Sequence, residues 1–136
     1  MLAEQILAIN ATTRKLCKNC DNGAIISQKM RLLYLVRNAD EALSPKELIN
    51  ELCIAKPNLS ILARNMIAEG LIEKMRVDRD MRSVHYKITD KGAEELNRMI
   101  AELDDSIAKQ LSLNEKEAQK GEKKLEAAIN FLNGAE

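Results

Sequence analysis

The sequence predicts a mainly α-helical protein with a small β-wing, an α+β chain. Aromatic residues make up only 2% and charged residues 31%, a balance that favours a helical core of Ala, Leu and Ile over a β-sandwich. Apolar residues recur at helical spacing over most of the chain, and two short segments alternate as strands do. At 136 residues we expect one domain, 1–136.

The N-terminal segment predicts an amphipathic helix that needs a partner. Its apolar seam consists of Leu2, Ile6, Ile9, Thr13, Leu16 and Cys20. The Asp-Asn-Gly run at 21–23 breaks this helix. A second helix is expected from Ser27 to about 38–40, with an apolar face of Met30, Leu33 and Val36.

The next segment carries the strongest helix start. Ser44 can accept from the N–H of Glu47, Glu47 can reach back to the N–H of Ser44, and Pro45 takes the first helical position. A further helix is expected from about 55 until Gly70 stops it. Two short helices this close together are typical of a helix-turn-helix.

Strands are expected at 71–77 and 83–88, joined by a charged tip at 78–82. A hairpin directly after a helix-turn-helix is a wing. A long helix is expected from 89–92, with apolar positions at Leu96, Ile100, Leu103, Ile107 and Leu111. The last helix is expected from about Asn114, with one face made of Ala118, Leu125, Ala128 and Leu132.

The net charge is zero, but its distribution is uneven. Residues 56–91 carry eight Lys/Arg and five Asp/Glu, whereas 92–136 carry six Lys/Arg and ten Asp/Glu. No apolar stretch approaches a membrane span, the N-terminus has no signal-peptide pattern, and three cysteines do not suit a secreted disulfide framework. We therefore expect a cytoplasmic protein with no membrane partner.

The sequence gives little support for catalysis. The single histidine, His85, lies in a predicted strand, and no Ser or Cys has an obvious base partner. Cys17-x-x-Cys20 without a second pair is a weak zinc signal, and structural zinc remains an alternative. We expect no enzyme activity, no cofactor and no metal.

The second helix of the helix-turn-helix is the candidate functional element. Leu59, Leu62, Met66 and Ile67 form its predicted apolar face. The residues off that face are Asn58, Ser60, Ile61, Arg64 and Asn65, with Lys56 at the N-terminal end. Amide, hydroxyl and guanidinium groups on a helix can contact base edges in a major groove, and the helix N-terminus favours a phosphate. The alternative is an ordinary solvated face.

The wing tip carries Arg79 and Arg82. Arginine at a narrow hairpin tip can enter a minor groove, where the negative potential is deepest. Asp80 would be repelled by phosphate unless it holds an arginine in place. The alternative is a hairpin tip that only keeps the wing soluble.

These segments together resemble the MarR (multiple antibiotic resistance regulator) family. Asp80-x-Arg82, seven residues to Thr89 and then x-x-Gly92 resembles its wing signature, and 44–48 and 56–60 resemble its two helix-turn-helix helices. The resemblance implies that Arg82 contacts the minor groove, that Asp80 orients it, and that the polar face at 58–65 contacts the major groove.

Two residues depart from the family pattern. Ala55 stands where the family usually has a Ser or Thr cap, so the start of that helix lacks a capping hydroxyl. Ile61 stands where a polar residue is common, which is consistent with contact to a thymine methyl group.

The resemblance also implies a homodimer, in which dimerisation helices at 1–22 and 93–136 flank a winged helix-turn-helix lobe at 26–92. The apolar seams agree with this; the alternative is a monomer that packs on itself. We expect a sequence-specific regulator, a repressor, on an inverted repeat of double-stranded DNA. The alternative is a winged-helix protein-interaction module, which would not need arginines at its wing tip.

The inducer stays open between a small molecule and an oxidant. Only Tyr34, Tyr86 and Phe131 are aromatic, so stacking on a phenolic ligand would be poorly served. Cys17 and Cys20 lie near the region where the family's thiol-based peroxide sensors carry their reactive cysteine, so we expect either to be the redox-sensing residue if one exists. Cys53, between two apolar neighbours, is expected to be a buried structural thiol.

Overall fold

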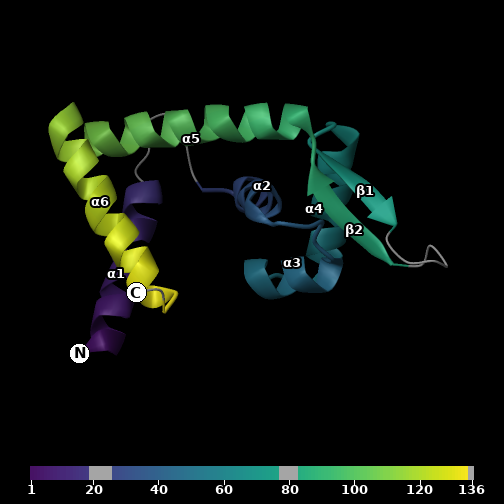
Figure 1. Ribbon diagram of the computed structural model, residues 1–136, viewed down its shortest axis with the longest axis horizontal. Helices are drawn as coiled ribbons and strands as arrows, with labels where there is room; N and C mark the ends of the chain where they lie inside the picture. The colour runs from purple at the N-terminus through teal and green to yellow at the C-terminus, as the bar shows by residue number, and fades with distance from the viewer. Residues whose placement is uncertain (19–25, 77–82, 135–136) are drawn as a thin grey trace. The chain divides into compact units, whose positions relative to one another are not determined.

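A computed structural model describes residues 1–18, 26–76 and 83–134 of the chain. Its elements, labelled in Figure 1, are α1 (Leu2–Lys18), α2 (Gln28–Asn38), α3 (Pro45–Leu52), α4 (Lys56–Ala68), β1 (Ile72–Arg76), β2 (Val84–Ile88), α5 (Asp90–Gln110) and α6 (Glu115–Leu132). This order of helices around one antiparallel hairpin confirms the predicted fold class. Within the described ranges, no helix is long and apolar enough to cross a membrane.

The chain packs as two compact units. We call 26–101 the winged-helix unit, and 1–25 together with 102–136 the terminal unit. The boundary falls inside α5, so this helix begins in the first unit and continues into the second.

The core of the winged-helix unit takes side chains from four helices and one strand. Its fully buried large residues are Leu32, Leu33, Leu48, Leu59, Met66, Ile72 and Leu96. The buried face of α4 is Leu59, Ala63 and Met66, whereas the predicted Leu62 and Ile67 are half-buried at its margin. Ala63 lies between Leu59 and Met66 on this face.

The predicted helix starts are confirmed. The N–H of Met30 donates to Ser27 Oγ at 3.1 Å, which caps α2. At α3 the N–H of Glu47 donates to Ser44 Oγ at 3.2 Å, and the N–H of Ser44 donates to the Glu47 carboxylate at 3.4 Å. The capping box, with Pro45 at the first helical position, therefore starts α3 where the sequence predicted it.

The two strands of the wing pair antiparallel from Ile72 opposite Ile88 to Arg76 opposite Val84. They lie side by side in Figure 1. Both are slightly shorter than predicted, and residue 77 lies outside the described residues. The backbones of Leu43 and Tyr86 also exchange hydrogen bonds, of 2.9 and 2.8 Å, which extends the sheet by one bridge. The alternation of apolar and polar residues that predicts a strand could not reveal this bridge, because Leu43 is a single paired residue.

The end of α4 is joined to the start of α5. Gly70 has a φ of 77° and ends α4 in a left-handed conformation that favours glycine. Thr89 Oγ1 donates to the Gly70 carbonyl at 2.6 Å and accepts from the N–H of Gly92 at 3.0 Å. The N–H of Thr89 donates to the Leu71 carbonyl at 3.1 Å. A Cβ at Gly92 would collide with that same carbonyl oxygen, so Gly92 allows the two segments to touch.

The terminal unit has no comparable core. Among its described residues no hydrophobic side chain is buried, and the buried polar residue is Ser106. Gln110 Nε2 donates to the carbonyl of Leu16 at 3.0 Å and to Ser106 Oγ at 3.3 Å, which ties the end of α5 to α1. The N-cap Asn114 and Glu117 form a second capping box at the start of α6.

We predict that Gly92→Ala lowers the free energy of unfolding by about 1–3 kcal/mol, because a methyl group must displace the Leu71 carbonyl. Gly121→Ala is the matched control: a Cβ there meets nothing within 4 Å, and removing a helical glycine should stabilise by about 0.5–1 kcal/mol. Urea unfolding at one protein concentration measures both. Equal effects of the two substitutions would contradict the close packing at Gly92.

Candidate nucleic-acid interface

The helix α4 has one buried and one exposed face. Every residue predicted for its polar face, Lys56, Asn58, Ser60, Ile61, Arg64 and Asn65, is exposed in the winged-helix unit. Ile61 is 54% exposed, which is unusual for an isoleucine that only packs a core. The Ser60 hydroxyl donates to the carbonyl of Lys56 at 3.2 Å, so only its acceptor capacity remains free.

The start of α4 is uncapped by a side chain. Its N-cap is Ala55, which makes no side-chain hydrogen bond, and Pro57 in the first turn has no N–H. The first N–H groups of an α-helix lack intrahelical partners. The start of α4 therefore presents backbone N–H donors and the positive end of the helix dipole. At the start of α3, by contrast, the capping box supplies hydrogen-bond partners.

A hollow of about 520 Å³ lies beside this helix start. Its lining comes from α3, α4 and the start of β2 and consists of Ser44, Pro45, Lys46, Ile49, Lys56, Ser83 and Val84. It contains two lysines and no carboxylate, and neither lysine is paired with a carboxylate of the described residues. We call it the basic hollow; it can accept an anion.

The basic hollow includes residues that the sequence did not single out. Lys46 and Ser83 belong to it, together with the predicted Lys56. The sequence did contain a signal for Lys46, because a lysine between the two residues of a capping box stands in the first turn of the helix. Nothing in the sequence indicated that Lys46 lies near α4, because α3 and α4 bring these residues together only in the folded unit.

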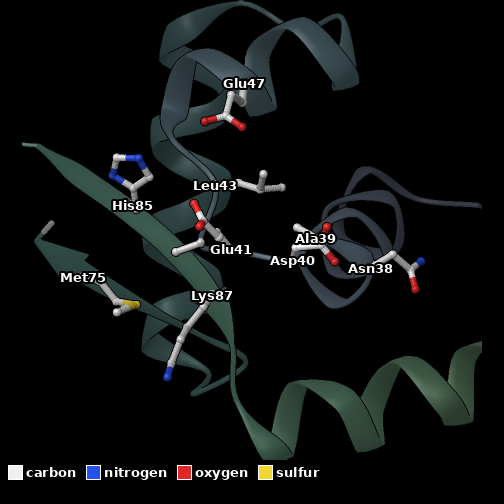
Figure 2. A pocket seen from close by; sticks show the side chains of 10 residues that line it. Asn38, Ala39, Asp40, Glu41, Leu43, Glu47, Met75, His85 and Lys87 are labelled. Atoms are coloured by element: carbon white, nitrogen blue, oxygen red, sulfur yellow. The ribbon is translucent and has the colours of Figure 1, made fainter.

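A second hollow, of about 850 Å³, has the opposite character. Its lining consists of Asn38 at the end of α2, residues 39–43 of the link to α3, and Glu47, Met75, His85 and Lys87. Figure 2 shows His85, Met75 and Lys87 on the hairpin and Glu47 on α3 around it. Asp40, Glu41 and Glu47 make this side acidic, and Lys87 Nζ is paired with Glu73 at 3.3 Å. We call it the acidic hollow.

Several predicted residues lie outside the described part of the chain. These are the wing residues Arg79, Asp80 and Arg82, and the candidate redox cysteine Cys20. The other candidate, Cys17, is in the last turn of α1. Their roles stay predictions.

The expectation that Cys53 is a buried thiol is wrong, because Cys53 is exposed. It ends α3 with a φ of 54°, and its Sγ lies 3.5 Å from the carbonyl oxygen of Asn50. The left-handed conformation turns the residue away from the core that Leu52 enters. Across residues 1–18, 26–76 and 83–134, no group of three His, Cys, Asp or Glu is placed to hold a metal ion.

One titration shift lies on α5 and not on α4. A hydrogen bond from Arg98 holds the pKa of Glu95 below its ordinary value; partial burial opposes this, and the charges of Arg98, Lys29 and Lys91 add to the lowering.

Comparison with known proteins agrees with this geometry. Residues 23–99 match the family described as Transcriptional regulator SarA/Rot. The HTH-type transcriptional regulator PecS of Dickeya dadantii is 32% identical over 66 residues, a match that covers 48% of this chain and only 40% of PecS. The chain therefore spans less than half of the length of that relative.

Solved structures share the fold. Wild-type apo MarR from E. coli superposes with a TM-score of 0.64 at 21% identity, covering 95% of this chain and 97% of MarR. A mutant of MepR from a multidrug resistant S. aureus clinical isolate gives 0.69 at 19% identity, covering 97% and 98%. At these identities the likeness establishes the winged-helix fold of the MarR type. Because the family match extends over more than half of its length, the chain belongs to the SarA/Rot family of transcriptional regulators.

Proposed function

We propose that this regulator is a sequence-specific double-stranded DNA-binding protein, a repressor that acts as a homodimer on an inverted repeat. The exposed face of α4 carries the proposal, because it places amide, guanidinium and methyl groups together on one helix. Arg64 suits a guanine, Asn58 and Asn65 suit adenine, and Ile61 suits a thymine methyl group. The protein's activity is then binding and not catalysis.

The basic hollow supports an orientation in which the exposed face of α4 contacts the DNA. Lys46 and Lys56 can each contact a backbone phosphate, and the phosphate at Lys56 can also accept from the uncapped N–H groups at the start of α4. The acidic hollow would repel DNA and therefore faces away from it. Two hollows of opposite charge favour DNA as the ligand of the α4 side over the alternative of a protein-interaction module.

The terminal unit supports the homodimer. Its exposed large hydrophobic residues include Leu2, Ile6, Leu7 and Ile9 on α1 and Leu125, Ile129, Phe131 and Leu132 on α6. Leu7 is 70% and Leu125 66% exposed in the single chain. Such apolar surface, with no buried apolar residue among the described ones beneath it, favours burial against a second copy.

Release of DNA would follow an inducer, either a small molecule or an oxidant. Cys17 and Cys20 remain the proposed thiols for an oxidant. The exposed Cys53 joins them as an accessible thiol that the sequence had assigned to the core.

Selection from a random DNA pool tests the function. We expect an inverted repeat whose half-site centres lie about 34–36 Å apart. Arg64→Ala and Arg82→Ala should each weaken binding by about 1–3 kcal/mol in a mobility-shift titration. Arg31→Ala, an exposed arginine of α2 in the same unit, is the control. No enriched sequence, or equal affinities of all variants, would contradict recognition by α4 and the wing.

Salt dependence tests the phosphate contact. The slope of log K against log salt is negative, and each lost phosphate contact lowers its magnitude by about 0.9. Lys46→Gln and Lys56→Gln should therefore each lower it by about 1.8 in a symmetric dimer, equally on specific and nonspecific duplexes. Lys123→Gln on α6 makes the same charge change and should leave the slope unaltered. A wild-type slope for both hollow variants would remove the basic hollow from the interface.

Sedimentation velocity tests the dimer. Ile129→Glu places a charge in the apolar stripe of α6 and should raise the dimer dissociation constant at least roughly tenfold. Asn130→Glu adds the same charge at a neighbouring exposed position and should leave the dimer intact. A wild-type protein that sediments as a monomer at micromolar concentration would refute this assembly.

A further inference from the structure

The acidic hollow continues into a second concave surface of the winged-helix unit. A hollow of about 410 Å³ extends along α2 and α3 and shares Asn38, Ala39, Leu43 and Glu47 with the acidic hollow as lining residues. We call the two together the acidic groove. We propose that the acidic groove binds a segment of another protein in which Arg or Lys side chains stand next to apolar ones. This goes beyond the DNA binding proposed above, because it gives a second ligand to a surface that α4 does not line.

The wing hairpin forms one wall of the acidic groove. Met75 is paired with His85 across the hairpin, so both side chains lie on the same face of the two-stranded sheet. Ile72 lies on the other face and is buried in the core. Met75 and His85 therefore point away from the core and line the groove together with residues 39–43 of the link between α2 and α3, as Figure 2 shows. Both are half-buried, so the link shelters this wall in part.

The charge of the acidic groove is negative. Asp40, Glu41 and Glu51 are exposed, and none of them pairs with a cation in the part of the chain that the structure describes. Glu47 adds a further carboxylate, which accepts from the N–H and the hydroxyl of Ser44. Several carboxylates along one groove attract a cationic partner and repel an anionic one.

Lys87 and Arg37 are cationic and lie near the groove, but both are already engaged. Lys87 Nζ lies 3.3 Å from the carboxylate of Glu73. The guanidinium of Arg37 lies over the ring of Tyr34, 5.4 Å from its centroid, and donates to Asn97 Oδ1 at 3.4 Å. These contacts occupy both cations, so the carboxylates of the groove remain available to a partner.

Apolar side chains between the carboxylates distinguish the acidic groove from a surface that is only charged. Leu43 and Met75 are half-buried, and Tyr34, which lines the end of the groove at α2, is 53% exposed. A metal ion would leave this apolar surface in water, whereas a peptide segment can cover it while its Arg or Lys side chains pair with the carboxylates. The lining extends over the hairpin, the link, α2 and α3, which gives room for several side chains of such a segment.

Selection from a random peptide library tests the proposal without DNA, so its outcome does not depend on the proposed function. Full-length wild type is the bait, after the library has been depleted on the double variant Asp40→Asn/Glu41→Gln to remove peptides that bind elsewhere. Both substitutions stand at exposed positions of the link and leave the core intact. We expect the enriched peptides to combine Arg or Lys with aromatic or aliphatic residues.

The affinity for an enriched peptide is then measured by fluorescence anisotropy. Glu41→Gln should weaken binding about threefold and the double variant about tenfold, and Tyr34→Ala should weaken it about tenfold. Glu94→Gln is the matched control, because it removes the same charge at an exposed position of α5 in the same unit but outside the groove; it should bind as wild type does. The amide resonances that shift when peptide is added should include those of residues 39–43 and His85.

Several results would overturn the proposal. The first is that no peptide is enriched after depletion, or that the enriched peptides lack basic residues. The second is an equal loss in Glu41→Gln and Glu94→Gln, because the net charge of the protein would then explain binding. The third is equally tight binding of an all-lysine peptide of the same net charge, or full displacement by spermidine at the same concentration, because charge alone would then suffice. None of these results bears on DNA recognition by α4, which the selection of duplexes decides.

Discussion

The close approach of Gly92 to the Leu71 carbonyl is the constraint on which the winged-helix unit depends. α4 ends, β1 begins and α5 starts next to this contact. Gly70 supplies the left-handed turn, Gly92 supplies the space, and Thr89 supplies the hydrogen bonds. The Thr-x-x-Gly pair of the wing signature therefore has a packing reason that is independent of any DNA contact.

The winged-helix unit has one basic and one acidic hollow on its surface. The chain as a whole has no net charge, yet its two hollows differ in sign. Glu47 contributes to both structure and charge: its carboxylate closes the capping box of α3 and lines the acidic hollow. The cost of an uncapped α4 is acceptable if a phosphate completes the cap, because the first N–H groups of a helix favour an anion.

The two units differ in how they can be stable. The winged-helix unit buries leucines from every helix it contains, whereas the described part of the terminal unit buries no apolar residue. A few helices that lie beside one another expose most of their surface, and the free energy of folding depends on apolar area removed from water. The proposed homodimer would bury this apolar surface and would thereby link dimerisation to folding.

The helix starts and stops were predictable from short stretches of sequence. Ser27, the capping box of Ser44 and Glu47, and Gly70 each act on residues within a few positions, so their signals survive without tertiary contacts. The polar face of α4 was also predictable, because helical period alone separates Asn58, Arg64 and Asn65 from Leu59 and Met66. Contacts between residues far apart in the chain became visible only in the folded protein: Lys46 and Lys56 line one hollow, Leu43 pairs with Tyr86, and Thr89 donates to the carbonyl of Gly70. It also turned Cys53 to the surface, since the exposure of a turn residue depends on its backbone conformation and not on the apolarity of its neighbours.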